Sequence, residues 1–457
     1  MPKRFSPGLG ALNTRAWCSA QYELPGRTRV NRLESPPNCA VIPVPPDLQI
    51  LIIGGGLSGL SAALHLARAG VEDLFVLEAE RIGQGGNVYL PGTPGPVFPD
   101  YTKMVLTPDD RGYTYLSRRF NREVARNLLR VKRRGVELQL ALAREFDPRL
   151  VRQYGTLIVG EPDDDRRLRE EHRVMRDLGI DADIESYGAE RIAALYGTPL
   201  GKYVQGLFVA GDAIVDSTRY VQAIARALGE TRYRERSRVV ELRDAGDAVE
   251  ARLENGESVT AAHAVVATNG FIIGRDANLQ GRMRSYWTFL VAFDDPGENT
   301  PNAYYFDPHA HYWARQDDKL IVGGEDTPVV EDNFRAPPDA ARSAERLTRW
   351  CAETFPRLVG RGQRALHYSV FGETRDNLPI LGRFAPESRV WYVVGDNGDG
   401  QSTLSCIAHL LPRAMGFTQP SAEEEALIRF LSPGRESLKE AAARVGITIL
   451  DLEKLQT

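Results

Sequence analysis

The sequence predicts an α/β protein in which a Rossmann-like dinucleotide-binding domain is interleaved with a mainly antiparallel β-sheet domain. The apolar run LQILIIGGG (48–56) is typical of a buried parallel strand that ends in glycines. A helical pattern follows and ends at Gly70, and DLFVLEAE (73–80) predicts a second strand. These segments form one βαβ unit. The chain after Trp287 is rich in strand-forming residues up to Gly324, which predicts the second domain.

The remaining elements follow from hydrophobic periodicity and turn residues. They are a charged helix with its Arg and Lys residues on a solvated face (113–145), a strand and turn (154–162), a charged helix whose first half is surface (163–178), a strand and helix (203–228), a hairpin (239–268), an amphipathic helix (339–355) and a last strand (389–396). The domain organisation expected from them is an extended N-terminal arm (1–46), a discontinuous dinucleotide-binding domain (47–140, 203–285 and 362–415), a substrate domain (141–202 and 286–361) and a C-terminal helical tail (416–457).

Composition excludes several classes of protein. Among the 457 residues, 42% are hydrophobic and 26% are charged, and the net charge of -4 gives no basic excess for binding nucleic acid. The four cysteines are far apart in sequence and form no CxxC pair, so neither a zinc site nor a disulfide framework is expected. There is no signal-peptide pattern and no apolar run long enough to span a membrane. We therefore expect a soluble cytoplasmic protein with no membrane partner, whose oligomeric state stays open.

The glycines after the first strand form a GxGxxG fingerprint. Gly54 permits the tight turn, Gly56 lets the backbone approach a pyrophosphate, and Gly59 allows close packing of the helix. The N-terminus of that helix offers free N–H groups to the phosphates. Glu78 ends the second strand, where an acidic side chain accepts hydrogen bonds from ribose hydroxyls. This context predicts dinucleotide binding rather than an empty glycine turn.

Four segments in a fixed order resemble the superfamily of FAD-dependent D-amino-acid and sarcosine oxidases, in pattern nearest to its γ-glutamylputrescine oxidase-like members. The resemblance covers residues 52–411. It is carried by ILIIGGGLSGLSAALHLARAG with VLEAERIGQGGN, by GDAIVDSTRYVQAIARAL, by AHAVVATNG, and by ETRDNLPILGR with WYVVGDNGDGQSTLS. It implies FAD as the cofactor. A second GxGxxG motif after a strand is missing, so electrons are expected to come from the substrate rather than from NAD(P)H.

The resemblance and the fingerprint together give a set of expected FAD-binding residues. They are Gly54, Gly56, Leu57, Ser58, Gly59, Glu78, Ala79, Gly86, Asn87, Val239, Ala267, Thr268, Asn269, Gly270, Gly395, Asn397, Gly398, Asp399, Gly400, Gln401 and Ser402. The loop GDNGDG (395–400) can point backbone N–H groups at the edge of the isoalloxazine ring that becomes negative on reduction. A triphosphate loop is excluded there because Gln401 stands where a Walker lysine would be required.

The implied reaction is oxidation of a C–N bond of an amine or amino acid to an imine, by hydride transfer to flavin N5. We expect the strand-rich segment after Trp287 to bind the substrate, with Tyr304, Tyr305, Tyr312 and Trp313 as candidate aromatic walls and Arg315 as the preferred anchor of a carboxylate. His309 and His311 have no third metal ligand at suitable spacing and predict a surface turn.

The chain departs from its relatives at several positions. Asp399 stands where many of them have histidine, and Gly86 replaces an arginine. Ile321 replaces the lysine that helps to activate oxygen in the sarcosine oxidase branch, and Tyr368 stands near that branch's flavin-linking cysteine. The electron acceptor is therefore either O2, as in an oxidase, or another carrier, as in a dehydrogenase. A flavin-binding protein with altered catalysis is the third possibility.

Overall fold

The structure of the protein is a computed structural model that describes residues 42–83, 102–180, 184–272, 276–295, 300–305, 311–316, 318–330, 334, 337, 340–359 and 365–443. The predictions for Gly86, Asn87 and His309, for most of the N-terminal arm and for the end of the C-terminal tail lie outside these residues.

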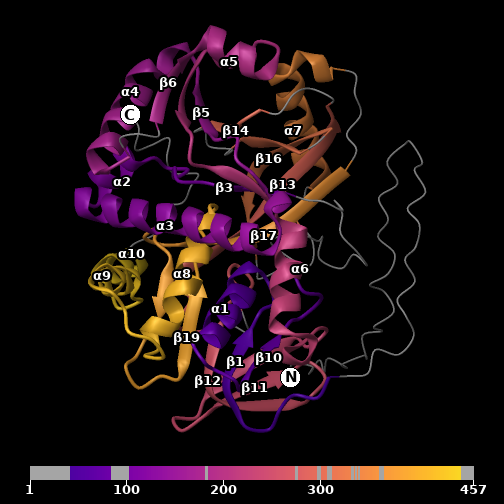
Figure 1. Ribbon diagram of the computed structural model, residues 1–457, viewed down its shortest axis with the longest axis vertical. Coiled ribbons are helices and arrows are strands. Elements are labelled where there is room, and N and C mark those ends of the chain that lie inside the picture. The colour runs from indigo at the N-terminus through magenta and orange to yellow at the C-terminus, as the bar shows by residue number, and fades with distance from the viewer. Residues whose placement is uncertain are drawn as a thin grey trace, which may run out of the picture. The chain divides into compact units, whose positions relative to one another are not determined.

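The first sheet has a parallel centre, as expected for a dinucleotide-binding domain (Figure 1). Strand β1 pairs in parallel with β2 on one side and with β12 on the other, and β12 also pairs in parallel with β19. Its strands are β1 (Leu48–Ile53), β2 (Leu74–Leu77), β9 (Tyr233–Arg234), β10 (Val239–Asp244), β11 (Val249–Leu253), β12 (Ser258–Val266), β18 (Ile380–Gly382) and β19 (Val390–Val394). Because β1 and β2 are buried along almost their whole length, they carry continuous apolar runs rather than an alternating pattern.

The second sheet is antiparallel except where β14 pairs with β5, which confirms the predicted fold class. In spatial order its strands are β17 (Ala365–Thr374), β13 (Met283–Asp294), β16 (Lys319–Pro328), β15 (Tyr312–Gln316), β14 (Asn302–Tyr305), β5 (Thr156–Gly160), β7 (Gln205–Val209) and β6 (Ile184–Gly188). Strands β7 and β17 belong to this sheet, whereas the domain boundaries expected from sequence assign their residues to the dinucleotide-binding domain. A small third sheet consists of β3 (Thr102–Val105), β8 (Ala213–Asp216) and β4 (Val151–Arg152).

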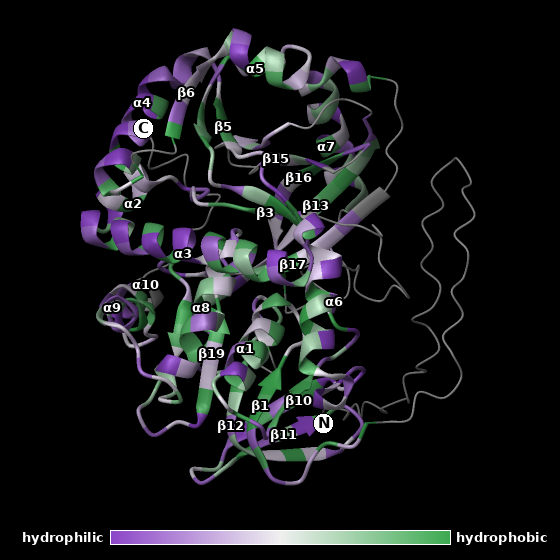
Figure 2. Ribbon diagram, in the orientation of Figure 1, coloured by the Kyte–Doolittle hydropathy of each residue, from purple (hydrophilic) through white to green (hydrophobic). Residues whose placement is uncertain are grey.

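Helices pack on both larger sheets. They are α1 (Leu57–Arg68), α2 (Tyr113–Arg119), α3 (Arg122–Phe146), α4 (Asp165–Leu178), α5 (Ala189–Tyr196), α6 (Ser217–Leu228), α7 (Ala340–Thr354), α8 (Gly400–Ala414), α9 (Ala422–Leu431) and α10 (Glu436–Ala443). Figure 2 shows β1 as mainly apolar, whereas α3 alternates between apolar and hydrophilic residues. None of the described helices is long and apolar enough to cross a membrane.

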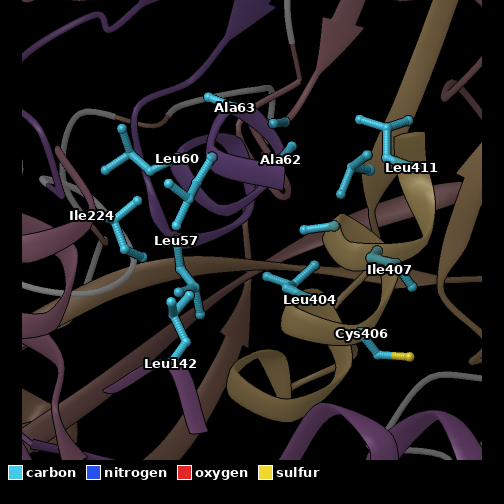
Figure 3. Packing of buried hydrophobic residues seen from close by; sticks show 14 of the residues in the cluster. Leu57, Leu60, Ala62, Ala63, Leu142, Ile224, Leu404, Cys406, Ile407 and Leu411 are labelled. Carbon is cyan, nitrogen blue, oxygen red and sulfur yellow. The ribbon is translucent and has the colours of Figure 1, made fainter. Parts of the chain in front are cut away.

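Helices α1 and α8 form the core beside the first sheet. Figure 3 shows that Leu57 and Leu60 of α1 belong to the same apolar cluster as Leu404 and Ile407 of α8. Leu60 and Ile407 are fully buried, and truncating such a side chain to alanine costs about 2–5 kcal/mol. This packing fixes the N-termini of the two helices, which both begin at glycine-rich loops.

The long helix predicted at 113–145 is in fact two helices. The break falls at Asn121, whose side chain accepts a hydrogen bond from Val124 N and caps α3. Lys132 is fully buried, so the prediction that the Lys and Arg residues of this segment share a solvated face is wrong for it. Glu171 is also buried rather than on the surface, because its carboxylate accepts hydrogen bonds from Tyr113 N and Thr114 N at the start of α2.

The C-terminal tail packs on the first domain through both of its helices. Leu427 and Leu431 of α9 join the α1–α8 core, and Leu438 of α10 joins the core on the other face of the sheet. The sequence left open whether the tail covers the domain or makes an oligomer contact, and for the described residues the tail covers the domain.

Candidate flavin and substrate site

The first glycine loop uses its glycines in two ways. A Cβ atom at Gly59 would lie 1.9 Å from Gly54 O, and one at Gly54, where φ is +108°, would lie 2.7 Å from Ala267 O. These two glycines are therefore required by packing. A Cβ atom at Gly56 would meet nothing within 4 Å, and no side chain caps α1 at this position. The loop thus leaves space and unbonded N–H groups in front of α1, which fits a pyrophosphate. Leu57 and Ser58, the next two residues, are buried in the first turn.

Glu78 lies at the end of β2 and faces this loop. Its carboxylate accepts hydrogen bonds from Gly55 N at 2.6 Å and from Glu80 N at 2.8 Å. Burial raises the pKa of Glu78 to about 7, although both backbone hydrogen bonds act in the opposite direction. Each oxygen keeps a second lone pair that can accept a ribose hydroxyl. Ala79, the next residue, is half-buried.

The loop after β12 lies against the first glycine loop and contains Ala267, Thr268, Asn269 and Gly270. Ser58 Oγ donates a hydrogen bond to Ala267 O at 3.2 Å. The Oγ1 atom of Thr268 is buried and has no hydrogen-bond partner among the described residues, which indicates a ligand group at this position.

Asn269 joins the β12 loop to the second glycine loop. Its Oδ1 atom accepts hydrogen bonds from the backbone N atoms of Gly395 (3.1 Å) and Asp396 (3.3 Å). Gly270 packs where a Cβ atom would lie 2.4 Å from Phe371 O, so this loop also contacts the second sheet. Val239, which the sequence also predicts to bind FAD, begins β10 and packs in the core beside Leu253.

The second glycine loop connects β19 to α8. Gly395, Asn397 and Gly398 all have positive φ angles, and Asn397 Oδ1 accepts a hydrogen bond from Thr374 N at 2.8 Å. Gly400 begins α8.

The side chains of the first turn of α8 are directed into the protein. Gln401 Oε1 accepts from Gln139 Nε2 at 2.7 Å, and Ser402 Oγ donates to Leu106 O at 2.7 Å. The backbone N–H groups at this helix terminus can meet an anion, so the residues present fit the negative edge of a reduced flavin.

Asp399 precedes α8 and is paired with a buried lysine. Its Oδ2 atom lies 2.5 Å from Lys132 Nζ and accepts a hydrogen bond from Asp110 N at 3.3 Å. Lys132 also lies 3.6 Å from the carboxylate of Asp109, which in turn pairs with Arg111. The carboxylate expected beside the flavin from sequence is therefore compensated by a nearby cation.

Strand alternation divides the predicted substrate residues between the two faces of the second sheet. Tyr304 and Tyr312 are cross-strand partners, and Tyr312 Oη lies 3.3 Å from Thr288 Oγ1. Tyr304 packs in the same core as Leu106, which precedes the Asp109–Arg111 loop. Among the predicted substrate residues, Tyr304 and Tyr312 are the ones on this face, which we call the inner face.

The other three predicted residues lie on the opposite face, which α7 covers. Trp313 packs against Trp350 of α7 at a ring distance of 5.5 Å, and Tyr305 packs against Tyr203 at 5.0 Å. Arg315 is buried there, and its guanidinium donates a hydrogen bond to Asp295 O at 2.5 Å. This arrangement contradicts the expectation that Arg315 anchors a substrate carboxylate.

The prediction that His311 belongs to a surface turn is also wrong, because His311 is buried. Its ring stacks on Trp350 with centroids 4.6 Å apart, and its Nε2 atom lies 3.2 Å from Glu325 Oε1. No group of three or more potential metal ligands occurs within the described part of the chain.

Two features of the site were not resolved from sequence. Period-two alternation separates Tyr304 from Tyr305, but only the pairing of β14 with β15 shows that Tyr304 shares a face with Tyr312. Lys132 lies on one helical stripe with Leu128, Gly135 and Gln139, all buried, so the spacing of four, three and four residues was the available signal. Its partner Asp399 is 267 residues away in sequence and had no local signal.

Comparisons with known proteins agree with this geometry. The profile of the FAD dependent oxidoreductase family (DAO) matches residues 49–412. The chain is 24% identical over 383 residues to gamma-glutamylputrescine oxidoreductase of Escherichia coli (strain K12), covering 79% of this chain and 82% of that protein.

Solved structures share the fold. L-proline dehydrogenase from P. horikoshii has a TM-score of 0.67 at 17% identity and covers 85% of this chain and 97% of its own. Glycine oxidase from Geobacillus kaustophilus has a TM-score of 0.68 at 15% identity and covers 82% and 96%. The two glycine loops, the acidic end of β2 and the matched profile lead to one conclusion: the chain belongs to the FAD dependent oxidoreductase family and is an FAD-containing enzyme of the amine and amino-acid oxidase type.

Proposed function

We propose that the protein oxidises a C–N bond of a small amine to an imine, with FAD as the hydride acceptor. The observation that carries this proposal is the meeting of three loops, after β1, β12 and β19. Ser58 joins the first to the second by its hydrogen bond to Ala267 O, and Asn269 joins the second to the third by accepting from Gly395 N and Asp396 N. The α1 N-terminus and Gly56 would hold the pyrophosphate, Glu78 the ribose, and the α8 N-terminus the pyrimidine edge of the flavin. When bound, FAD supplies a two-electron acceptor.

We assign the inner face of the second sheet as one wall of the substrate site. This face carries Tyr304, Tyr312 and Thr288. Asp326 lies near Tyr312, and burial raises the pKa of Asp326 to about 7. The Oδ1 atom of Asp326 is buried and has no hydrogen-bond partner among the described residues. A carboxyl group in this state can accept a hydrogen bond or a proton from a substrate nitrogen, which must be neutral to react.

An amine is favoured over an α-amino acid because the expected carboxylate anchor is occupied. Arg315 binds Asp295 on the far face, and Arg357 also pairs with Asp295 at 2.7 Å. Three carboxyl groups, those of Asp326, Asp110 and Asp399, act on the pKa of Tyr312. Asp399 is paired with Lys132, so we assign Asp326 as the carboxyl group on this face that attracts a cationic amine.

The test is anaerobic titration of the purified yellow protein with primary amines, secondary amines and α-amino acids. We expect an amine to bleach the flavin absorbance, and we expect Asp326→Asn to raise KM for that amine at least tenfold while FAD stays bound. Reduction by amino acids alone would overturn the preference for amines, and no reduction by any substrate would support a flavin protein with altered catalysis.

Admission of air after reduction identifies the electron acceptor. Ile321 stands where oxidases of the sarcosine branch have an oxygen-activating lysine, so we expect slow reoxidation by O2 and faster reoxidation by a quinone. Reoxidation by O2 that keeps pace with turnover would instead assign an oxidase. A cytoplasmic location stays a prediction from sequence.

A further inference from the structure

Lys132 is a fully buried lysine fixed between α3 and α8. Its ammonium group lies 2.5 Å from Asp399 Oδ2 and 3.6 Å from Asp109 Oδ2. The two helices touch closely around it, because a Cβ atom at Gly135 would lie 1.7 Å from Ser402 O and because Gln139 donates to Gln401. The position of the ammonium group is therefore set by backbone packing on both sides.

Stability alone does not account for a buried charge at this position. Replacing a buried ion pair by apolar side chains of similar volume is often neutral or stabilising. Beside this pair, Asp109 also pairs with Arg111, and burial together with Asp399 raises the pKa of Asp110. Lys132 and Asp399 form an ion pair whose two charges cancel.

The side chain of Asp399 has an unusual direction for its place in the chain. Asp399 is the N-cap residue of α8, a position at which aspartate normally accepts hydrogen bonds from the first backbone N–H groups of the helix. It makes no such capping bond, and its carboxylate is turned to Lys132 and Asp110 N. The first N–H groups of α8 are consequently left for another acceptor.

We propose that Lys132 is a positioning residue that keeps Asp399 from capping α8 and cancels its charge, so that the α8 N-terminus stays available to stabilise a reduced flavin. This inference rests on the proposed function only in placing the negative edge of the flavin at that helix terminus. Without Lys132, the carboxylate competes for the same N–H groups and repels the anion that they stabilise.

The experiment measures the two-electron reduction potential of bound FAD with a chemical reductant and needs no amine substrate. At a fixed ambient potential, Lys132→Met is expected to lower the ratio of reduced to oxidised flavin about tenfold, which corresponds to about 30 mV. The double variant Lys132→Met/Asp399→Ala is expected to return to the wild-type ratio, because charge and competing acceptor are removed together. Lys132→Gln, which removes the charge but keeps an amide donor, serves if Lys132→Met does not fold.

The matched control is Gln139→Met, which alters the same helix contact without changing charge. It is expected to leave the ratio unchanged, even if thermal unfolding of the apoprotein shows a loss of stability. An unchanged ratio in both Lys132 variants, an equal fall in Gln139→Met, or a double variant that stays as low as the single one overturns the inference. A protein that holds FAD but oxidises no amine overturns only the proposed reaction.

Discussion

At the scale of residues, neighbouring glycines in the first loop serve packing and ligand space separately. Gly54 and Gly59 are held by backbone contacts, whereas the space beyond Gly56 is open. A side chain at Gly56 therefore has no protein atom to displace, and its effect should fall on the cofactor.

We predict that Gly56→Val folds normally but binds FAD at least about a hundredfold more weakly, because the branched side chain fills the space for the pyrophosphate. Fluorescence titration of the apoprotein with FAD measures this. Gly188→Val is the matched control, since Gly188 is also a helix N-cap with negative φ and open space. Equal FAD affinity in both variants would contradict the assignment of the loop.

Glu78 gives a prediction about pH. Its folded-state pKa of about 7 lies above the ordinary value of 4.5, so between pH 4.5 and pH 7 the folded apoprotein binds more protons than the unfolded chain. The free energy of unfolding that Glu78 contributes therefore falls as pH rises through this range. A shift of this size corresponds to roughly 3 kcal/mol. From pH 5 to pH 8 the free energy of unfolding of Glu78→Gln should therefore rise relative to that of the wild type by up to this amount.

Denaturant unfolding of the two apoproteins at several pH values measures the difference. The variant must be compared with the wild type because other groups also change the stability with pH. The pKa values of His65, His367 and His409 are lowered in the folded state, so their contribution to the free energy of unfolding rises with pH below pH 6.5. Glu123→Gln, on the exposed surface of α3, should run parallel to the wild type. A parallel curve for Glu78→Gln would refute the predicted linkage.

At the same scale, some site residues could be read from sequence and others could not. The glycines and Glu78 follow from local motifs whose geometry depends on a few adjacent residues. Arg315 was assigned from residue type alone, without the strand alternation that places it with Trp313 rather than Tyr312. The burial of Lys132 could have been read from helical spacing, but its pairing with Asp399 could not, because the partner is 267 residues away.

At the scale of elements, the close contact of α3 with α8 sets the position of the second glycine loop. We predict that Gly135→Ala destabilises the protein by about 1–3 kcal/mol, because the added methyl group would overlap Ser402 O and the helices must separate. FAD affinity should fall with it, since α8 moves. Chemical denaturation and FAD titration test this, with Arg134→Ala as an exposed control on the same helix.

The C-terminal tail is the second element with a testable role. Arg435 pairs with the buried Asp376 at 2.6 Å and also donates to Leu378 O and Pro379 O, so it holds the turn that follows β17. Thr374, at the start of that turn, donates to Asn397 in the second glycine loop.

Arg435→Ala should therefore cost about 3–5 kcal/mol, because it leaves Asp376 as a buried unpaired charge, and it should weaken FAD binding. Arg429→Ala, which removes an exposed pair with Glu425, should cost less than about 0.5 kcal/mol. Thermal unfolding and FAD titration distinguish the two. Full FAD affinity in Arg435→Ala would show that the tail does not shape the loop.

Most elements were predictable, and the exceptions have local causes. The break between α2 and α3 depends on the Asn121 cap, which interrupts a pattern that is otherwise helical throughout. Strand β8 is only four residues long and directly precedes α6, so its apolar run gave little signal of its own.

At the scale of the whole molecule, FAD binding should stabilise the fold, because its proposed contacts come from segments far apart in sequence. At a free concentration one hundred times its Kd, a ligand that binds only the folded state adds about 2.7 kcal/mol to the free energy of unfolding. We expect this increase for wild-type apoprotein and no more than about 0.4 kcal/mol for Gly56→Val at the same FAD concentration. Denaturant unfolding with and without FAD measures it.

The sequence by itself determined the βαβ unit, the mainly antiparallel second sheet and the binding of a dinucleotide, because these depend on short-range periodicity and on glycines at fixed spacing; its resemblance to a known family implied that the dinucleotide is FAD. Only the tertiary structure decided which face of the second sheet carries Tyr304 and Tyr312, that Arg315 is bound to Asp295, and that Lys132 meets Asp399. Those outcomes depend on which segments pack together across the fold, and the free energy of burying a charge is fixed by a partner that the local sequence does not reveal.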